Sequence, residues 1–557
     1  MPETENSIIS ELLDDVSFKE NICAHFTNPV QPAEYSTLPD TLDDRLASIL
    51  KQSGIDHLYN HQRFAWDAIQ QKQHTVISTG VASGKSLCYQ LPLLQSYLED
   101  SESRAILLFP TKALAQDQRS GLEKFNQNLS TEFNLRPPGI GVYDGDLPSG
   151  QRDAVRKTAS FIFTNPDMLH FGILPHHTQW AQFLRNLKYI IIDEVHVYRG
   201  IFGSHFTNVI RRLKRIASFY GAIPQFIITS ATLANSHTYI NALIEEEAVL
   251  ISSDTAPHGE SHFLIYNPPL LNEELGIRKP AMEETVSIAR QLLRQDLQTL
   301  VFAQTRKAVE LILSSLHLHT ADKSAIVGYR SGYLPQERRQ IEEGLRNGKI
   351  RMVVATNALE LGIDIGGIDV VLLNGYPGSI TSTRQQAGRA GRKGLPSAAI
   401  LVASAGLLDQ YLARNPDYLI HGNIEAALIN PDNPYILFHH LQCALFEKTF
   451  QKNESFGKLS PEKVREFFQL LEKVGKLHHS QDEYFWSSTS YPANDISLRT
   501  AGADNYILQT EDEVIGIVDQ ESAFWMAHPG AVYIHNGSPY LVDDLDIEHH
   551  KALLKST

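Results

Sequence analysis

The chain has 557 residues, of which 42% are hydrophobic and 20% are charged. That is the ordinary mix of a globular protein rather than of a disordered or fibrous one. At roughly 150 residues per domain, the length predicts three to four domains. The formal charge of −15 argues at first against a nucleic-acid-binding protein, whose usual surface is basic.

The acidic residues gather at the two ends of the chain. Residues 1–50 and residues 501–557 each hold ten acidic residues against two basic ones, which leaves the middle 450 residues close to neutral. Net charge does not say where charges sit, so this middle part has room for a local basic surface. We interpret residues 1–44 as a separate acidic segment, a flexible or regulatory lead-in.

The cysteines and the apolar runs indicate the compartment. Cys23, Cys88 and Cys443 lie far apart with no C-x-x-C pair, which excludes a disulfide framework and a cysteine-type zinc site and favours a reducing environment. The acidic N-terminus has no apolar signal-peptide core. The longest apolar runs fall far short of the ~20 residues that span a bilayer. We therefore expect a cytoplasmic protein with no membrane segment.

Short apolar runs rich in β-branched residues alternate with amphipathic stretches, which predicts an α/β fold with parallel sheets. The first series predicts strands at 75–79, 105–109, 160–164, 189–193 and 225–230, with helices at 86–98 and 207–220. The second series predicts strands at 299–303, 324–329, 351–356, 370–374 and 399–403. A Pro-containing stretch at 254–280 is the expected linker, so we predict two α/β lobes over 45–260 and 261–430.

The pattern changes after residue 431. Predicted helices at 435–450 and 461–473 and a short strand at 483–486 indicate a winged-helix-like unit over 431–500. From residue 505 the alternation has period two, with an Asn536-Gly537 hairpin signal. We therefore predict a small β domain over 501–557, with at least three or four strands, no closing strand at its end and an unpaired edge.

The segment 79–86, TGVASGKS, follows a predicted strand and precedes a predicted helix. In that position backbone N–H groups face an anion at the helix N-terminus. Lys85 would reach the β- and γ-phosphates of a nucleotide, and the Ser86 hydroxyl would hold Mg²⁺. The strict pattern G-x-x-x-x-G-K-[ST] is not met, because Thr79 stands five residues before Gly84 and the nearest glycine is Gly80. A G-K-S turn that binds no nucleotide is the alternative for this segment alone.

The segment 189–196, YIIIDEVH, places Asp193 and Glu194 at the carboxyl end of a buried strand, where α/β sheets bind ligands. Asp193 is suited to anchor Mg²⁺, and Glu194 to polarise the water that attacks the γ-phosphate. A solvated acidic turn is the alternative for this pair alone. Together with the phosphate-binding segment, the pair predicts an ATP site.

The order of the motifs resembles that of a superfamily-two DEAD/DEAH-box helicase. The first lobe holds LYNHQ (58–62), TGVASGKS (79–86), FPTKALAQDQ (109–118), TNPD (164–167), DEVH (193–196) and SAT (230–232), and the second holds VFAQTRKAVE (301–310), ATNALELGIDI (355–365) and QQAGRAGR (385–392). The segments 143–148, 198–216, 328–339 and 433–444 are similar to the YprA-type, RecQ-four-like group of DNA helicases, which includes the bacterial mitomycin repair factor.

The resemblance implies two RecA-like lobes that bind ATP and Mg²⁺ between them. It assigns catalysis to Lys85, Asp193, Glu194, Arg389 and Arg392, with Ser86 and Asp193 at the metal. It assigns the nucleotide to Gln62, which would read adenine, to Gly80, Ser83, Gly84, Lys85, Ser86 and Gly362, and to Asp364 at the ribose. An ordinary surface glutamine is the alternative for Gln62. Because both arginines belong to the second lobe, the cleft must close for hydrolysis and can open after it.

The resemblance also implies a nucleic-acid track across the tops of both lobes. The expected contacts are Thr111, Lys112, Thr164 and Arg199 on the first lobe and Thr305, Arg306, Arg330 and Thr356 on the second. His196, Ser230 and Thr232 would couple this track to the ATP site. Hydroxyls and a few basic residues suit backbone contact without sequence reading, and a surface or helix-capping role is the alternative for each residue.

The implied function is that of an ATP-dependent helicase or translocase on single-stranded or tailed DNA, with 3′→5′ polarity and a role in DNA repair. RNA as the substrate, or an ATPase switch without unwinding, stays open. We favour a monomer. Members of this group continue into a module with four metal-binding cysteines, whereas this sequence stops at Thr557. We therefore expect a fragment, a shortened homologue, or one of two chains.

Overall fold

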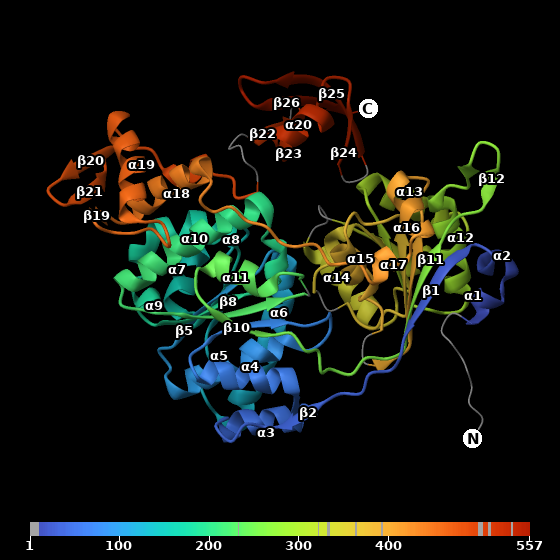
Figure 1. The fold of residues 1–557 in the computed structure, drawn as a ribbon, viewed down its shortest axis with the longest axis horizontal. Helices are drawn as coiled ribbons and strands as arrows, with labels where there is room; N and C mark the ends of the chain where they lie inside the picture. The colour runs from blue at the N-terminus through green and yellow to red at the C-terminus, as the bar shows by residue number, and fades with distance from the viewer. Residues whose placement is uncertain are drawn as a thin grey trace.

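Two α/β lobes lie side by side, with two smaller domains attached (Figure 1). The computed structural model describes residues 10–231, 233–320, 322–330, 335–362, 365–391, 394–499, 505–510, 514–535 and 538–556. Within these residues no helix is both long enough and apolar enough to cross a membrane.

The first lobe is a seven-stranded parallel sheet in the order β10-β4-β9-β8-β5-β7-β6. All five strands predicted for this lobe are confirmed, and the short edge strands β6 and β10 are added to them. The strands are β4 (His74–Ser78), β5 (Arg104–Leu108), β6 (Ile140–Val142), β7 (Phe161–Thr164), β8 (Leu187–Ile192), β9 (Gln225–Ser230) and β10 (Ala248–Ile251).

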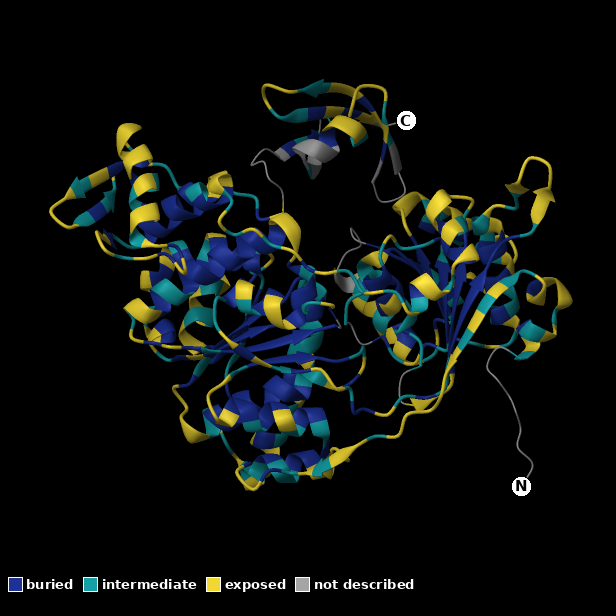
Figure 2. Ribbon diagram, viewed as in Figure 1, coloured by how far each residue is buried: buried dark blue, intermediate teal, exposed yellow. Residues whose placement is uncertain are grey.

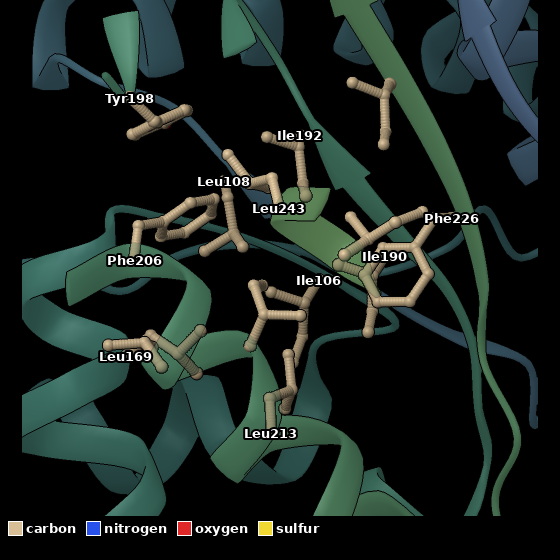
Figure 3. Packing of buried hydrophobic residues seen from close by; sticks show 14 of the residues in the cluster. Ile106, Leu108, Leu169, Ile190, Ile192, Tyr198, Phe206, Leu213, Phe226 and Leu243 are labelled. Atoms are coloured by element: carbon tan, nitrogen blue, oxygen red, sulfur yellow. The ribbon is translucent and has the colours of Figure 1, made fainter. Parts of the chain in front are cut away.

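Helices cover both faces of this sheet, and each face has its own apolar core. Figure 3 shows the face on which Phe206 and Leu213 pack against Ile106, Ile190 and Phe226. The helices are α3 (Asp44–Gln52), α4 (Asn60–Gln70), α5 (Lys85–Glu99), α6 (Lys112–Phe133), α7 (Ser149–Thr158), α8 (Pro166–Met168), α9 (Ala181–Arg185), α10 (Gly200–Phe219) and α11 (Ser236–Ile244).

The second lobe is a seven-stranded sheet in the order β1-β11-β18-β17-β14-β16-β15. Its central strands are buried on both faces (Figure 2), as parallel strands between helices should be. The parallel strands are β11 (Ser261–Tyr266), β14 (Thr299–Ala303), β15 (Ile326–Tyr329), β16 (Met352–Ala355), β17 (Val370–Asn374) and β18 (Ser397–Val402). The helices are α12 (Ala281–Arg294), α13 (Arg306–His317), α14 (Pro335–Arg346), α15 (Ile380–Ala387), α16 (Leu407–Arg414) and α17 (Asp417–Ile420).

The N-terminal segment is an integral part of the second lobe. Helices α1 (Ser10–Asp14) and α2 (Val16–Lys19) precede β1 (Ile22–Asn28), which pairs antiparallel with β11. Leu12 and Phe18 are buried in the core of that lobe, and the Phe18 ring stacks on Tyr266 at 5.1 Å. The expectation of a flexible lead-in is therefore wrong for residues 10–28, because their apolar side chains cover the edge of the second sheet.

The connection between the lobes is shorter than the expected linker 254–280. Residues 261–266 form β11, which is inserted between β1 and β18. The small hairpin of β12 (Leu270–Asn272) and β13 (Ile277–Arg278) follows it. Pro257 lies in the connection before β11, and the other three prolines of the stretch lie after β11, around this hairpin.

The winged-helix-like unit packs on the first lobe. It comprises α18 (Pro434–Glu447), α19 (Pro461–Lys473) and a three-stranded sheet of β19 (Phe450–Gln451), β20 (Leu477–Ser480) and β21 (Glu483–Trp486). Helix α18 lies against α10, where Arg212 and Glu447 form an ion pair with side chains that are 0% and 1% exposed. Arg215 of α10 lies over the Phe450 ring at 3.6 Å. These buried contacts fix the unit to the lobe.

The C-terminal domain is a five-stranded sheet in the order β23-β22-β26-β25-β24 with one helix. Its elements are β22 (Asn505–Gln509), β23 (Val514–Asp519), α20 (Gln520–Met526), β24 (Val532–His535), β25 (Ser538–Asp546) and β26 (Lys551–Ser556). The expected Asn536-Gly537 turn lies outside the described residues, although β24 and β25 pair as a hairpin requires. The expectation that no strand closes the domain is wrong, because β26 lies between β22 and β25.

Candidate functional site

The phosphate loop joins β4 to α5 at the carboxyl edge of the first sheet. Gly84 caps α5 with φ +79°, a left-handed conformation that favours glycine. Lys85 Nζ donates to the carbonyl oxygens of Thr79 and Gly80 at 2.9 and 2.8 Å, and Ser83 Oγ donates to Gly80 O at 3.0 Å. Lysine and backbone amides thus converge where a phosphate would bind a helix N-terminus.

Gln62 is held against this loop rather than turned away to solvent. Its Nε2 donates to Gly84 O at 3.0 Å, and its Oε1 accepts from Tyr59 N at 3.0 Å. Only 6% of the residue is exposed. The alternative of an ordinary surface glutamine is therefore excluded, and Gln62 links the segment before α4 to the loop.

Asp193 directly follows β8, which is separated from β4 and the phosphate loop by the single strand β9. Its Oδ1 accepts from Glu194 N at 3.0 Å and from the Thr229 hydroxyl. Burial and the adjacent Glu194 raise the pKa of Asp193 to about 7. A second cation beside Lys85 would return this carboxyl to its ionised form.

Glu194 is a buried carboxylate of the first lobe that also contacts the second lobe, at Gly362. Its backbone is left-handed, with φ +49°. Burial raises the pKa of this carboxyl, but the neighbouring His196, Lys85 and Arg389 together outweigh burial, so the pKa lies below its ordinary value. Among the described residues, Oε2 has no hydrogen-bond donor, and it lies 3.4 Å from His196 Nδ1. An ionised, buried carboxylate with an unused oxygen suits a group that orients water.

His196 connects three motifs. Its Nδ1 accepts from Ala231 N at 3.2 Å, and its Nε2 lies 2.6 Å from Gln385 Nε2 of the second lobe. Burial lowers the pKa of His196, so the ring is neutral at pH 7 and the charges of Lys85 and Arg389 hold Glu194 ionised. The coupling role of Ser230 stays a prediction. The Ser230 hydroxyl bonds to Ala231 O, whereas the link to His196 runs through the Ala231 amide.

The second lobe brings a glycine and an arginine to this cluster. Gly362 packs on Glu194, where an added Cβ would lie 3.1 Å from Oε1, and its amide lowers the pKa of Glu194. Gly362 therefore supports the carboxylate, and its contact with a nucleotide stays a prediction. Arg389 is 1% exposed and donates to Glu360 O, and its charge acts on Glu194. Thr232, Asp364 and Arg392 lie outside the described residues.

Oxygen donors suited to Mg²⁺ lie between the loop and β8. Ser86 Oγ donates to Gln118 Oε1 at 2.6 Å, and Tyr89 OH donates to the same oxygen at 2.7 Å. Burial and the nearby Asp193 raise the pKa of the Tyr89 hydroxyl, and the hydrogen-bond network of Ser86 lowers it, so both groups lie in the surroundings of this hydroxyl. A hydroxyl and a carboxylate are ligands that Mg²⁺ prefers, with water and phosphate oxygens completing its shell.

Three of the four threonines expected on the nucleic-acid track are helix caps. Thr111 Oγ1 accepts from Leu114 N at 3.3 Å, Thr305 Oγ1 from Ala308 N at 3.1 Å, and Thr356 Oγ1 from Ala358 N at 3.5 Å. Thr111 and Thr305 therefore cap the N-termini of α6 and α13. Such helix starts hold phosphate groups, so capping and backbone contact are compatible there.

The other expected contacts divide by exposure. Arg199, Lys112 and Arg306 reach the surface, and Lys112 Nζ pairs with Asp146 at 2.6 Å. Thr164 is 2% exposed and donates to Tyr143 O at 2.6 Å. Arg330 is 5% exposed and bonds to Glu310 at 3.0 Å. The structure thus contradicts direct contact for Thr164 and Arg330, whose polar atoms are turned into the fold.

A cavity of about 450 Å³ lies between the lobes beside His196. The carboxyl ends of β14, β16 and β17 line it from the second lobe, and the segment 196–199 lines it from the first. Thr305 and Thr356 directly adjoin lining residues in the chain. Its wall includes His196, Arg199, Gln304, Asn357, Asn374 and Gln385. Sequence reasoning missed Gln385 as a coupling residue, although it lies one helical turn before Arg389 in the quoted motif.

This combination of two parallel-sheet lobes, a phosphate loop and an acidic pair defines the class of nucleic-acid-dependent ATPases. The sequence matches the DEAD/DEAH box helicase family over residues 59–239 and the helicase conserved C-terminal domain over residues 284–394. Residues 429–501 match the winged helix domain of the ATP-dependent helicase HRQ1.

Individual proteins resemble most of the chain. The uncharacterized ATP-dependent helicase YprA of Bacillus subtilis is 44% identical, over 98% of this chain and 73% of its own length. The ATP-dependent helicase HRQ1 of Saccharomyces cerevisiae is 34% identical over 99% of this chain, but the chain spans only 52% of that protein. The crystal structure of the DUF1998 helicase MrfA bound to DNA and AMPPNP has a TM-score of 0.88 at 44% identity, covering 98% of this chain and 76% of that one. The chain belongs to this family of ATP-hydrolysing DEAD/DEAH-box helicases.

Proposed function

We propose that this chain hydrolyses Mg-ATP between its lobes and uses the resulting motion to travel 3′→5′ along single-stranded DNA in DNA repair. The observation that carries the proposal is the buried cluster in which Glu194 meets Lys85 and His196 of its own lobe and Gly362 and Arg389 of the other. Groups from both lobes surround this carboxylate, so its surroundings are complete only when the cleft is closed.

Each residue of the cluster has a defined task in this proposal. Lys85 and the loop amides bind the phosphates, with Ser83, Gly84 and Ser86 in the same loop. Ser86 and Asp193 hold Mg²⁺, which supplies charge neutralisation on the phosphate oxygens. Glu194 orients the attacking water, and Arg389 stabilises the charge that develops in the transition state.

The remaining assignments rest on fewer observations. Gln62 would read adenine after exchanging its bond to Gly84 O, and Arg392, Asp364 and Thr232 keep the tasks that the family resemblance implies. We propose that the DNA backbone meets the starts of α6 and α13, Lys112, Arg199, Arg306 and Thr356. The MrfA structures contain DNA, which supports DNA over RNA. The three free cysteines agree with a reducing compartment, and we also propose a cytoplasmic monomer.

ATP hydrolysis by the purified chain, with and without single-stranded DNA, tests the core of the proposal. We expect Glu194→Gln to lower kcat by at least about 10²-fold, because a general base contributes that much or more, while nucleotide binding persists. Lys85→Ala should weaken nucleotide binding itself. Exposed Glu247→Gln, on the same lobe, is the matched control and should behave as the wild type.

Three outcomes would change the assignment. Full turnover by Glu194→Gln would refute the active site. If RNA stimulates ATP hydrolysis as strongly as DNA or more strongly, the assignment of DNA as the substrate is wrong. A strand-displacement assay with 3′-tailed and 5′-tailed duplexes reports polarity, and ATP hydrolysis without displacement of either would indicate a switch rather than a helicase.

A further inference from the structure

Two chain segments connect the lobes beside the phosphate loop, and they run antiparallel. Gln31 N donates to His258 O at 2.9 Å, and His258 N donates to Gln31 O at 3.0 Å. Gln31 Nε2 also donates to Asp254 O at 2.9 Å, and Glu34 N donates to Thr255 O at 3.0 Å. We call these two segments, residues 29–34 and 252–260, the hinge, because they join the first lobe to β1 and β11 of the second.

One carboxylate of the hinge bonds to the backbone of the phosphate loop. Asp254 Oδ2 accepts from Gly80 N at 2.9 Å and lies 3.3 Å from His258 Nε2, while Oδ1 accepts from Ala256 N at 3.1 Å. Burial raises the pKa of Asp254, but His258 and the two amides outweigh it, and the pKa lies below its usual range. The group is therefore an ionised acceptor shared between the hinge and the loop.

A second contact, through His61, joins the hinge to the same loop three residues further on, at Ser83. His61 Nδ1 lies 2.8 Å from Thr255 Oγ1, and its Nε2 lies 3.0 Å from Ser83 O. His61 is fully buried. Asp254 thus contacts the loop directly at Gly80, and the adjacent Thr255 contacts it through His61 at Ser83.

The approach of Asp254 explains why the loop departs from the strict phosphate-binding pattern. A Cβ at position 80 would lie 2.8 Å from Asp254 Oδ2, so a side chain there would displace the carboxylate from its present position. Thr79, which replaces the usual glycine, is 1% exposed, and its hydroxyl lies 2.6 Å from Ser83 Oγ. The glycine at position 80, rather than at position 79, therefore goes together with the contact between the loop and Asp254 of the hinge.

The loop needs such external support because part of its backbone is unfavourable. Ala82 has φ +63°, a left-handed conformation that side chains other than glycine seldom adopt. An empty loop held by Lys85 alone would relax, and a nucleotide would then have to restore its shape on binding. External contacts that keep the loop in shape improve affinity by removing this ordering cost.

We propose that Asp254 is a positioning residue which, through the Gly80 amide, keeps the phosphate loop in its nucleotide-binding shape and ties that shape to the hinge. The inference rests on the proposed nucleotide site. Asp254 touches neither the phosphates nor the attacking water in this arrangement. Its loss should therefore raise KM for ATP and leave kcat at saturating ATP nearly unchanged, because bound phosphates themselves hold the loop amides.

The full-length chain is assayed as Asp254→Ala, Asp254→Asn, His258→Ala and Asp254→Ala/His258→Ala, with Ser253→Ala as the matched control on the same hinge segment. KM and kcat are measured for ATP, and Kd for the fluorescent nucleotide N-methylanthraniloyl-ADP is measured without DNA. For Asp254→Ala we expect KM and Kd to rise about tenfold, the effect of losing one charged hydrogen bond, with kcat within about twofold of the wild type.

Two comparisons separate positioning from a general loss of structure. Asp254→Asn keeps an oxygen that accepts from Gly80 N, so it should restore KM to within about threefold of the wild type. His258→Ala should raise KM less than Asp254→Ala does, and should add nothing to it in the double variant, because both act through one contact.

Several results would overturn the inference. Wild-type Kd and KM in folded Asp254→Ala would do so, as would an Asp254→Asn variant as defective as Asp254→Ala, or additive effects in the double variant. If Asp254→Ala does not fold, Asp254→Asn and His258→Ala still decide the matter. Binding of the fluorescent nucleotide needs neither hydrolysis nor unwinding, so failure of the helicase proposal is seen separately, as a wild type that binds nucleotide without DNA-dependent turnover.

Discussion

Replacing Arg212 with methionine tests whether the winged-helix unit is a fixed extension of the first lobe. Arg212 Nε donates to both carboxylate oxygens of Glu447 at 3.1 Å, and Arg212 Nη1 lies 2.6 Å from His170 Nδ1. Both charged side chains are essentially inaccessible to water. The variant would leave the Glu447 carboxylate buried without its cation.

The size of the effect follows from that burial. Removing one partner of a buried ion pair costs about 3–5 kcal/mol, whereas replacing both partners with apolar residues of similar volume is often neutral. We therefore expect Arg212→Met to lower the opening free energy of α10 and α18 by about 3–5 kcal/mol. Arg212→Met/Glu447→Leu should regain most of that loss.

Native-state hydrogen exchange is the appropriate assay, because it reads local opening in each helix and does not assume that a multidomain chain unfolds in one step. Arg465→Met breaks a more exposed ion pair with Glu462 on α19, and it should leave the protection of α10 and α18 unchanged. The reasoning is refuted if Arg212→Met also leaves that protection unchanged, or if the double variant is as unstable as the single one.

Three further results are expected. Burial and the Arg212 charge hold the pKa of His170 and of His440 well below the ordinary value. Both rings are thus neutral when folded and gain protons on unfolding. Protection of α18 should therefore fall as the pH drops below about 6.5, by up to about 1.4 kcal/mol per pH unit for each histidine, and constant protection from pH 7.5 to 5.5 would contradict this. Arg389→Ala should lower kcat by about 10³-fold or more with fluorescent-nucleotide binding intact, and a kcat within tenfold of the wild type would exclude a transition-state role. Phe18→Ala should destabilise the second lobe by about 3 kcal/mol or more, seen as a lower Tm, and an unchanged Tm would mean that the N-terminal segment contributes nothing to that lobe.

The strands that the sequence predicts well are those whose side chains are buried on both faces. The run 189–193 and its counterparts in both lobes are continuous and apolar, and the structure confirms them as central parallel strands. Strand β1 escaped prediction because it covers a sheet edge: its burial alternates along ICAHFTN, and its neighbours are acidic. Its partner β11 has a clear apolar run, but that run lies within the stretch judged to be a linker.

The residues of the candidate site also differ in how far the sequence could predict them. Motif order identified Lys85, Glu194 and Arg389, because the chemistry needs those residue types at those places. It could not show that the Thr164 hydroxyl turns inward toward Tyr143, since that depends on which face of β7 is covered. Nor could it reveal Asp254, whose contact with Gly80 exists only once the hinge has folded over the loop.

The position of β1 also sets an order of events during synthesis. Residues 10–28 leave the ribosome before their partner β11, which follows them by more than 230 residues, and β18, on the far side of β11, is made later still. The first lobe, whose sheet lies within residues 74–251, is complete by then. Domains tend to fold as they emerge. The N-terminal helices, with Leu12 and Phe18, must therefore wait as an exposed apolar segment while a whole lobe folds behind them. Chaperones and proteases would meet the nascent chain at this segment.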